Sequence, residues 1–354
     1  MLTNPSALAD ENSAFDYSLK DIQQLSPDHW AFMEFKHGKT DLGILAKLYA
    51  RFEPLSSSWM DFRRELDATN DKSIFKDTKD EGDLPLYKGA CIWQYDSRYW
   101  EHSKKNENAP QYWLNPYKFD KYLRNIEINR LISDVYPQIS ATSKQITKEK
   151  HVINTLRLNE KKDLDIFIHP DREFFRLGFR AITSDTNERT LIAAIIPPNI
   201  GAQNSLWLSI PKKYIFSNNT VKIAEVKISR ILFAQAIFNS LIIDWILRFS
   251  VAINVNKTYI MRLPIPQPSD SEIENNPTYK EIVINSLLLS CYYNSEGFAQ
   301  LLSIFGLQKK DIPDSEKKSL LLQAKNDALI AHIYGITKDE MKHILKSFPL
   351  FTNK

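Results

Sequence analysis

The uncharged run Thr190 to Ile196, TLIAAII, constrains the fold more than any other feature of this 354-residue chain. A strand with one face in water alternates apolar and polar side chains, whereas a continuous apolar run is expected for a strand covered on both faces. Pro197 and Pro198 follow at once and end the strand, because proline cannot donate to a strand ladder. We therefore expect a buried strand inside a layered fold.

The other segments of the chain supply the remaining layers. Composition and alternation predict strands at 84–95, 163–169, 174–182, 205–210 and near 259–265. Helical spacing predicts helices at 40–52, 119–135, 230–249, 277–305, 314–333 and 337–347. Thr40 is expected to cap the first helix, and Thr337 with Glu340 to form a capping box for the last, after Gly335 ends its predecessor. The expected fold is α+β, a mixed sheet region with an N-terminal helical lead and a helical C-terminal part.

The stretch 230–249 is the most apolar in the chain, and it is apolar on more than one face. Gln235, Asn239 and Asp244 interrupt it, which favours a buried helix of a soluble protein over a membrane span. We expect no membrane association.

Charge divides the chain into three segments. Residues 1–83 carry a net charge of −6, residues 84–265 a net of +10, and residues 266–354 a net of −1. We predict that these are a lead or linker, a recognition region and a helical region. A basic field of this kind is what a polyanionic partner such as DNA needs.

Glycine usage excludes a methyl-donor site in this chain. It contains nine glycines, and no two are separated by a single residue, so no loop for S-adenosylmethionine can be drawn. Two segments look like the catalytic tetrapeptide of an adenine methylase, one beginning at Asn115 and one at Asn276. The first is a residue short and the second has Thr278 for a proline, so both are interpreted as turns or helix starts. We predict no catalytic residues.

Metal and redox chemistry have no sequence signature either. The two cysteines are far apart and the seven histidines are scattered, so neither a metal site nor a disulfide is expected. The segment from His169 to Asp171 begins like a nuclease motif, but no Glu-x-Lys follows, and solvated turn residues are the better interpretation. The N-terminus lacks the pattern of a signal peptide. These features fit a cytoplasmic protein.

Donor groups and aromatic rings are mixed in the basic segment. Arginine can bind guanine in a bidentate manner and glutamine can bind adenine, while other cations contact phosphates. An internal role remains open, in which the arginines pair with neighbouring carboxylates such as Asp96, Asp171 and Glu188. The predicted DNA contacts are Lys88, Gln94, Arg98, Arg176, Arg180 and Arg189.

Several ordered segments resemble the target-recognition half of adenine-specific DNA methyltransferases, the type IIG-like restriction–modification enzymes and the BREX-type methylases. The resemblance covers nearly the whole chain, although Lys88 replaces an acidic residue, Ser97 replaces a histidine, and 251–256 lacks paired glycines. The segments are DATNDKSIF (67–75), LPLYKGACIWQYDSRY (84–99), QYW (111–113), FRAITSDTNERTLIAAIIPP (179–198), 238–266 and 328–350.

The resemblance implies a specificity portion that binds double-stranded DNA and presents a target adenine to a methyltransferase subunit on another chain. That partner would hold S-adenosylmethionine, and this chain would hold no cofactor. Separation from the catalytic half implies an uncovered apolar patch in the lead, around Phe32, Phe35, Leu45, Tyr49 and Phe52. Two alternatives stay open: a truncated, inert methyltransferase fragment, or a structural protein subunit of a phage-defence complex.

Overall fold

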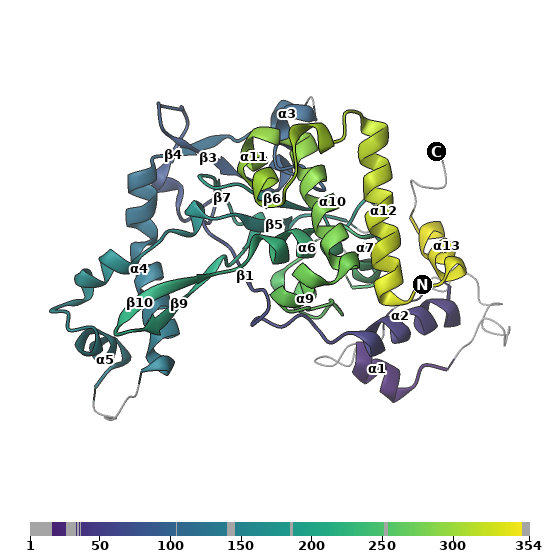
Figure 1. Ribbon diagram of the computed structural model, residues 1–354, viewed down its shortest axis with the longest axis horizontal. Helices are drawn as coiled ribbons and strands as arrows, with labels where there is room; N and C mark the ends of the chain where they lie inside the picture. Colours follow the sequence, from purple (N-terminus) through teal and green to yellow (C-terminus); the bar gives the residue numbers. More distant parts are fainter. Residues whose placement is uncertain are drawn as a thin grey trace.

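The computed structural model confirms an α+β fold (Figure 1). It describes residues 16–25, 33, 35, 37–103, 105–139, 146–184, 187–250 and 254–348. The strands are β1 (Phe62–Arg63), β2 (Phe75–Lys76), β3 (Leu84–Tyr87), β4 (Tyr112–Leu114), β5 (Arg176–Arg180), β6 (Ala193–Ile196), β7 (Gly201–Ala202), β8 (Leu206–Ser209), β9 (Lys212–Ser217) and β10 (Thr220–Glu225). The helices are α1 (Leu19–Leu25), α2 (Lys39–Arg51), α3 (Tyr99–His102), α4 (Pro116–Val135), α5 (Lys148–Thr155), α6 (Ile228–Phe238), α7 (Leu241–Arg248), α8 (Lys257–Met261), α9 (Asp270–Asn275), α10 (Pro277–Tyr293), α11 (Ser295–Ile304), α12 (Glu316–Tyr334) and α13 (Lys338–Lys346).

The strands form two four-stranded sheets and a separate hairpin. One sheet has the antiparallel order β1-β8-β5-β6, and the other has the order β2-β4-β3-β7, in which β3 and β7 run parallel. The apolar run that ends at Ile196 forms β6, and its residues from Thr190 to Ile196 are all buried, as the sequence predicts. Because β6 is the last strand of its sheet, one edge of its backbone must find partners outside the sheet.

Side chains from the apolar helices supply those partners. The Asn239 amide accepts from the Ala193 N–H at 3.1 Å and donates to the Ala193 carbonyl at 2.9 Å. Gln235 Oε1 accepts from the Ile195 N–H at 2.7 Å. Asp244 Oδ1 accepts two further backbone N–H groups just before β6, at 2.7 and 2.9 Å. The polar residues that interrupt the 230–249 stretch therefore complete the edge of the sheet.

The predicted single helix over 230–249 is two helices. α6 ends at Phe238, α7 begins at Leu241, and the two are bent by 57°. Ser240 starts the second helix, because its hydroxyl accepts from the Ile243 N–H. Within the described part of the chain, no single helix is both long and apolar enough to cross a membrane, and this bent pair passes only when its two helices are taken together.

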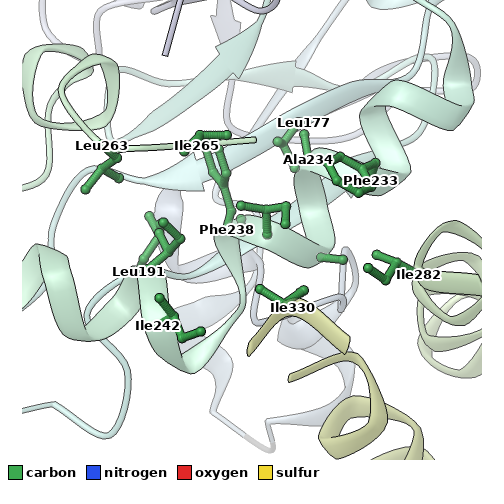
Figure 2. Close-up of a cluster of buried hydrophobic side chains, with 14 of the residues drawn as sticks. Leu177, Leu191, Phe233, Ala234, Phe238, Ile242, Leu263, Ile265, Ile282 and Ile330 are labelled. Atoms are coloured by element: carbon green, nitrogen blue, oxygen red, sulfur yellow. The ribbon is translucent and has the colours of Figure 1, made fainter. Parts of the chain in front are cut away.

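One core joins all three predicted segments of the chain. Figure 2 shows Leu177 and Leu191 from the sheet region packed with Phe238, and with Ile282 and Ile330 from the C-terminal helices. The N-terminal lead contributes to the same core through α2. The fold therefore buries the lead and the C-terminal helices together with the larger antiparallel sheet.

This packing makes the prediction of an uncovered patch in the lead wrong. Leu45 is fully buried, and Phe35, Tyr49 and Phe52 pack against the core of their own chain. Phe52 meets Tyr334 edge to face, and burial raises the pKa of Tyr49 to about 12. Phe32, the remaining member of the predicted patch, lies outside the described residues.

A second, smaller core holds together an arm formed by α4, α5, β9 and β10, at the lower left of Figure 1. The β9–β10 hairpin is not among the predicted elements, and its turn places Asn218 and Asn219 at φ 55° and 59°. The strand predicted at 163–169 is wrong, because Lys161–Phe167 forms a 3₁₀ helix. Leu164 and Phe167 are three residues apart and lie on one face of that helix, toward the arm core.

Other boundaries also differ from the predictions. The strand predicted over 84–95 ends at Tyr87, the strand near 259–265 is replaced by the helix α8, and the helix predicted over 277–305 breaks at Asn294. Thr40 does not cap α2, which begins one residue earlier after Gly38.

Several terminus predictions are confirmed. Thr337 and Glu340 form the capping box of α13, after Gly335 ends α12 at φ 69°. Both methylase-like segments are helix starts, because Asn115 and Asn276 accept backbone N–H groups at the first turns of α4 and α10.

Candidate nucleic-acid interface

The segment after β3 leaves the sheet in a tight, irregular path. A 3₁₀ turn at Gly89–Cys91 brings the backbone close to Ser205, whose hydroxyl accepts from the Gly89 N–H at 3.0 Å. A Cβ at position 89 would lie 2.7 Å from the Ser205 carbonyl oxygen, so only glycine fits there without a shift. Lys88 precedes this turn and is half-buried.

A second turn follows and is fixed by the buried interior. The backbone N–H groups of Trp93 and Asp96 each donate to the other residue's carbonyl, at 2.8 and 3.1 Å. Between them, Tyr95 adopts φ 62°, a left-handed conformation that costs free energy in a non-glycine residue. Its N–H donates to the Ala193 carbonyl at 3.1 Å and its side chain is buried. Ala193 on β6 therefore anchors both this turn and α6.

Asp96 sets the start of α3. Its buried carboxylate accepts from the Arg98 N–H at 2.8 Å through Oδ1, and its Oδ2 lies 2.9 Å from His102 Nδ1. Burial raises the pKa of Asp96, although the His102 hydrogen bond opposes that shift. These two contacts of Asp96 orient Arg98 and Tyr99 at the start of the short helix α3.

Aromatic rings and cations meet on the outer side of these turns. The Trp93 and Tyr99 rings stack at 5.3 Å with an interplanar angle of 28°. The Arg180 guanidinium carbon lies 4.9 Å from the centre of the Trp93 ring and 5.6 Å from that of Tyr99. All three side chains are half-buried. We call Trp93, Tyr99 and Arg180, with the flanking Lys88 and Arg98, the Trp93 cluster.

The two arginines of the Trp93 cluster differ in their burial and in their hydrogen-bond partners. Burial lowers the pKa of Arg180 to about 10, so this group is still charged at neutral pH. Its Nε donates to the Ile92 carbonyl at 3.0 Å, which fixes the guanidinium over the rings. Arg98 is 32% exposed and is bound by Glu101 and by Glu296 at 3.3 Å. A polyanion that reaches Arg98 must compete with these two carboxylates.

Three predicted DNA contacts lie inside the protein instead. Gln94 is 5%, Arg176 1% and Arg189 4% exposed. Gln94 Oε1 accepts from Arg189 Nε at 2.8 Å, and both side chains donate to the Asn239 carbonyl. They stabilise the junction of β6 with α6, and the DNA-contact prediction for them is wrong in this conformation.

Arg176 belongs to the buried charge of the sheet. Its Nη1 lies 2.8 Å from Glu65 Oε1, and its Nη2 donates to the Ile200 carbonyl. Sequence reasoning missed these roles because the same guanidinium and amide groups bind either a base edge or a buried carbonyl.

A buried ion-pair network occupies the base of the arm. Arg63 contacts Glu127 and Asp171 at 2.8 Å each, Arg130 contacts Asp171 at 2.8 Å, and Lys212 contacts both carboxylates. Burial raises the pKa of Asp171, but Arg63, Lys212 and Arg130 outweigh it and lower the value to about 2. Asp171 is 4% exposed, so the expectation of a solvated turn residue is wrong.

A cavity of about 410 Å³ adjoins this network beside α4. The carboxylates around it are paired within the protein: Asp120 with Arg172 at 2.6 Å and Asp165 with Arg124 at 2.7 Å. Acid–base chemistry needs carboxylates that are free of ion-pair partners. Among the described residues, the cavity is not lined by two such carboxylates, because these salt bridges and the buried network engage them.

Comparisons with known proteins give a distant structural likeness. No family model matches the chain, and no curated protein matches it. A similar solved structure is that of the type IIL restriction–modification enzyme MmeI in complex with DNA, at 10% identity and a TM-score of 0.38. The match covers 83% of this chain and 36% of that one, so this chain spans about a third of the enzyme's length. A likeness at this level establishes neither the activity nor the partners of this chain.

Proposed function

We propose that this chain binds double-stranded DNA and is the target-recognition portion of an adenine-specific methyltransferase in a restriction–modification system. The Trp93 cluster carries the proposal, because it combines half-exposed stacking rings with three cations on a rigid, buried framework. Cations bind phosphates, and a guanidinium can bind a base edge. The cluster also lies in the segment that resembles the methyltransferase recognition half.

In this proposal, a partner subunit performs the methyl transfer. A methyltransferase subunit binds S-adenosylmethionine, flips the target adenine and transfers the methyl group. This chain positions the duplex through Lys88 and Arg98, and Arg180 holds the Trp93 and Tyr99 rings in place. Calorimetry of the purified chain with S-adenosylmethionine should show no binding; micromolar binding would contradict this division.

One observation favours the alternative of a structural subunit. Several cations of residues 84–265 are paired with carboxylates that lie outside this segment: Arg176 with Glu65, Arg230 with Asp270 and Lys257 with Asp61. Less charge is therefore available to a polyanion than the net of +10 indicates. A DNA-binding measurement separates the two functions.

The test is fluorescence anisotropy with labelled duplex DNA over a series of salt concentrations. If about four to six phosphates are contacted, the log–log slope of affinity against salt should be about −4 to −5. Lys88→Ala and Arg98→Ala should each weaken binding, and loss of a phosphate contact should reduce the slope by about 1. Lys325→Ala is the matched control, because Lys325 is an exposed cation paired with Glu281 on the C-terminal helices.

The outcomes are distinct. If Lys325→Ala weakens binding as much as Arg98→Ala, the Trp93 cluster is not the contact surface. Absence of binding at about 50 mM salt would favour the structural subunit. Loss of binding with unchanged thermal stability in Lys88→Ala and Arg98→Ala supports direct contact.

A further inference from the structure

Two histidines and a buried aspartate meet where the N-terminal lead packs on the last helix. His37 lies just before α2, Asp41 lies in its first turn, and His343 lies on α13. His343 Nε2 is 2.7 Å from Asp41 Oδ1, and His37 Nδ1 is 3.6 Å from Asp41 Oδ2. The two imidazole rings lie 5.0 Å apart in an edge-to-face arrangement. One potential ligand atom from each residue falls within 4.8 Å of the other two.

The local fold prepares this arrangement. Gly38 has φ 53° and turns the backbone so that His37 lies beside the helix start. Asp41 Oδ2 accepts from the His37 N–H at 2.8 Å, which fixes the carboxylate while Oδ1 points to His343. Asp41 is 1% exposed and His37 is 46% exposed at its side chain, so the group is anchored inside and open to solvent on one side.

The donor set suits a divalent transition metal. Imidazole nitrogen and carboxylate oxygen bind zinc at about 2.0–2.2 Å, so two ligands of a tetrahedral ion lie about 3.3 Å apart. The distances of 2.7 Å from Oδ1 to His343 and 3.6 Å from Oδ2 to His37 lie on either side of that value. Two histidines and one carboxylate also leave a fourth position for water.

We propose that His37, Asp41 and His343 form a binding site for a divalent transition-metal ion of the zinc type. The ion lies between Asp41 and His343, where it replaces their direct contact, and draws His37 into coordination. It joins α2 to α13, beside the ion pair of Lys47 with Glu340 that links the same two helices at 2.7 Å. The site therefore ties the lead to the C-terminal helices, independently of the DNA-binding function proposed for the Trp93 cluster.

The sequence alone predicts no metal site, since His343 lies 302 residues from Asp41. His37 and Asp41 are spaced i, i+4, but such a pair occurs on many helices without a metal. A helix packing contact supplies the third ligand, and no local pattern encodes that contact.

The test is calorimetric titration of the full chain with zinc chloride, followed by the absorption spectrum with cobalt(II) in its place. His37→Ala is the deciding variant, because its exposed side chain can be removed with little effect on the fold. His169→Ala is the matched control: His169 is an exposed histidine 3.8 Å from Glu173 at i, i+4, with no second histidine ligand grouped with it among the described residues. Melting curves without metal check that both variants fold like the wild type.

We expect the wild type and His169→Ala to bind one zinc ion and to give the visible bands of four-coordinate cobalt(II). His37→Ala should weaken zinc binding by more than about 100-fold, since loss of a group that only supports a ligand already costs about 10–100-fold. Zinc should also raise the Tm of the wild type and leave that of His37→Ala unchanged. Equal zinc affinity in His37→Ala and the wild type, or no zinc binding by the wild type, would overturn the proposal.

Discussion

Replacing Asn239 by leucine tests how the edge of the larger antiparallel sheet is completed. Leucine has nearly the same size as asparagine, but it leaves the Ala193 N–H and carbonyl without the partners that the Asn239 amide provides at 3.1 and 2.9 Å. Both residues are buried, so water cannot replace the lost bonds. The Ala193 carbonyl still accepts from the Tyr95 N–H at 3.1 Å, so only the Ala193 N–H is orphaned, at a cost of about 1–3 kcal/mol.

Burial of the leucine side chain offsets part of this cost. With the second hydrogen bond to the carbonyl also lost, we expect a net loss of about 1–3 kcal/mol in the free energy of unfolding. Urea denaturation followed by tryptophan fluorescence measures it as a lower midpoint with an unchanged slope. Hydrogen exchange at the Ala193 amide should also become faster, because that N–H loses its acceptor.

Asn275→Leu is the matched control, since the same chemical change is made at an exposed position near the end of α9. Its effect should stay within about 0.5 kcal/mol of zero. If Asn239→Leu shifts the urea midpoint no more than this control does, the helix amides do not complete the sheet edge, and the reasoning is refuted.

Three further substitutions, with Gly43→Ala as a control for one of them, test individual contacts. Asp171→Asn should cost about 3–5 kcal/mol at neutral pH, because it leaves buried cations unpaired. Asp171 has a pKa lowered to about 2 from 3.8, so its contribution is complete above about pH 4 and is lost as pH falls toward 2; acid titration of wild-type stability should show this loss and the variant should not. Gly89→Ala should destabilise by about 1–3 kcal/mol, because its Cβ would lie 2.7 Å from the Ser205 carbonyl oxygen, whereas Gly43→Ala meets nothing within 4 Å and should stabilise α2 by about 0.5–1 kcal/mol. Thr337→Ala should lower the free energy of unfolding by about 1 kcal/mol through loss of the α13 cap; an unchanged melting temperature would show that the cap contributes nothing.

Local rules predicted the parts of the fold that depend on few neighbours. The buried strand β6 follows from an uncharged run that two prolines end, and the α13 start follows from the capping box at Thr337. Both signals lie within a few residues of the feature that they specify. The general α+β composition is predicted for the same reason.

Predictions failed where the same short sequence pattern is compatible with two kinds of secondary structure. The alternation over 163–169 fits a strand with Leu164 and Ile166 on one face, but Ile166 is 74% exposed, and Leu164 and Phe167, which pack on the arm core, have the spacing of a 3₁₀ helix. The arm core decided between them. The break between α6 and α7 lies at Asn239, and the side-chain amide of Asn239 binds the backbone of Ala193 on β6, 46 residues earlier in the chain.

The candidate sites show the same limit. The sequence identified the segment that contains Lys88, Arg98 and Arg180, because residue types that bind nucleic acid are dense there. It could not separate them from Gln94 and Arg189, whose donors are used by buried carbonyls.

The sequence by itself determined which segments are apolar, where several helices begin and end, and where cations and aromatic rings are concentrated. Tertiary structure alone decided which donors face inward, how β6 completes its edge, and that His343 reaches Asp41 across 302 residues. The physical reason is that propensity and capping act over a few residues, whereas burial and hydrogen-bond partnership depend on contacts between distant segments.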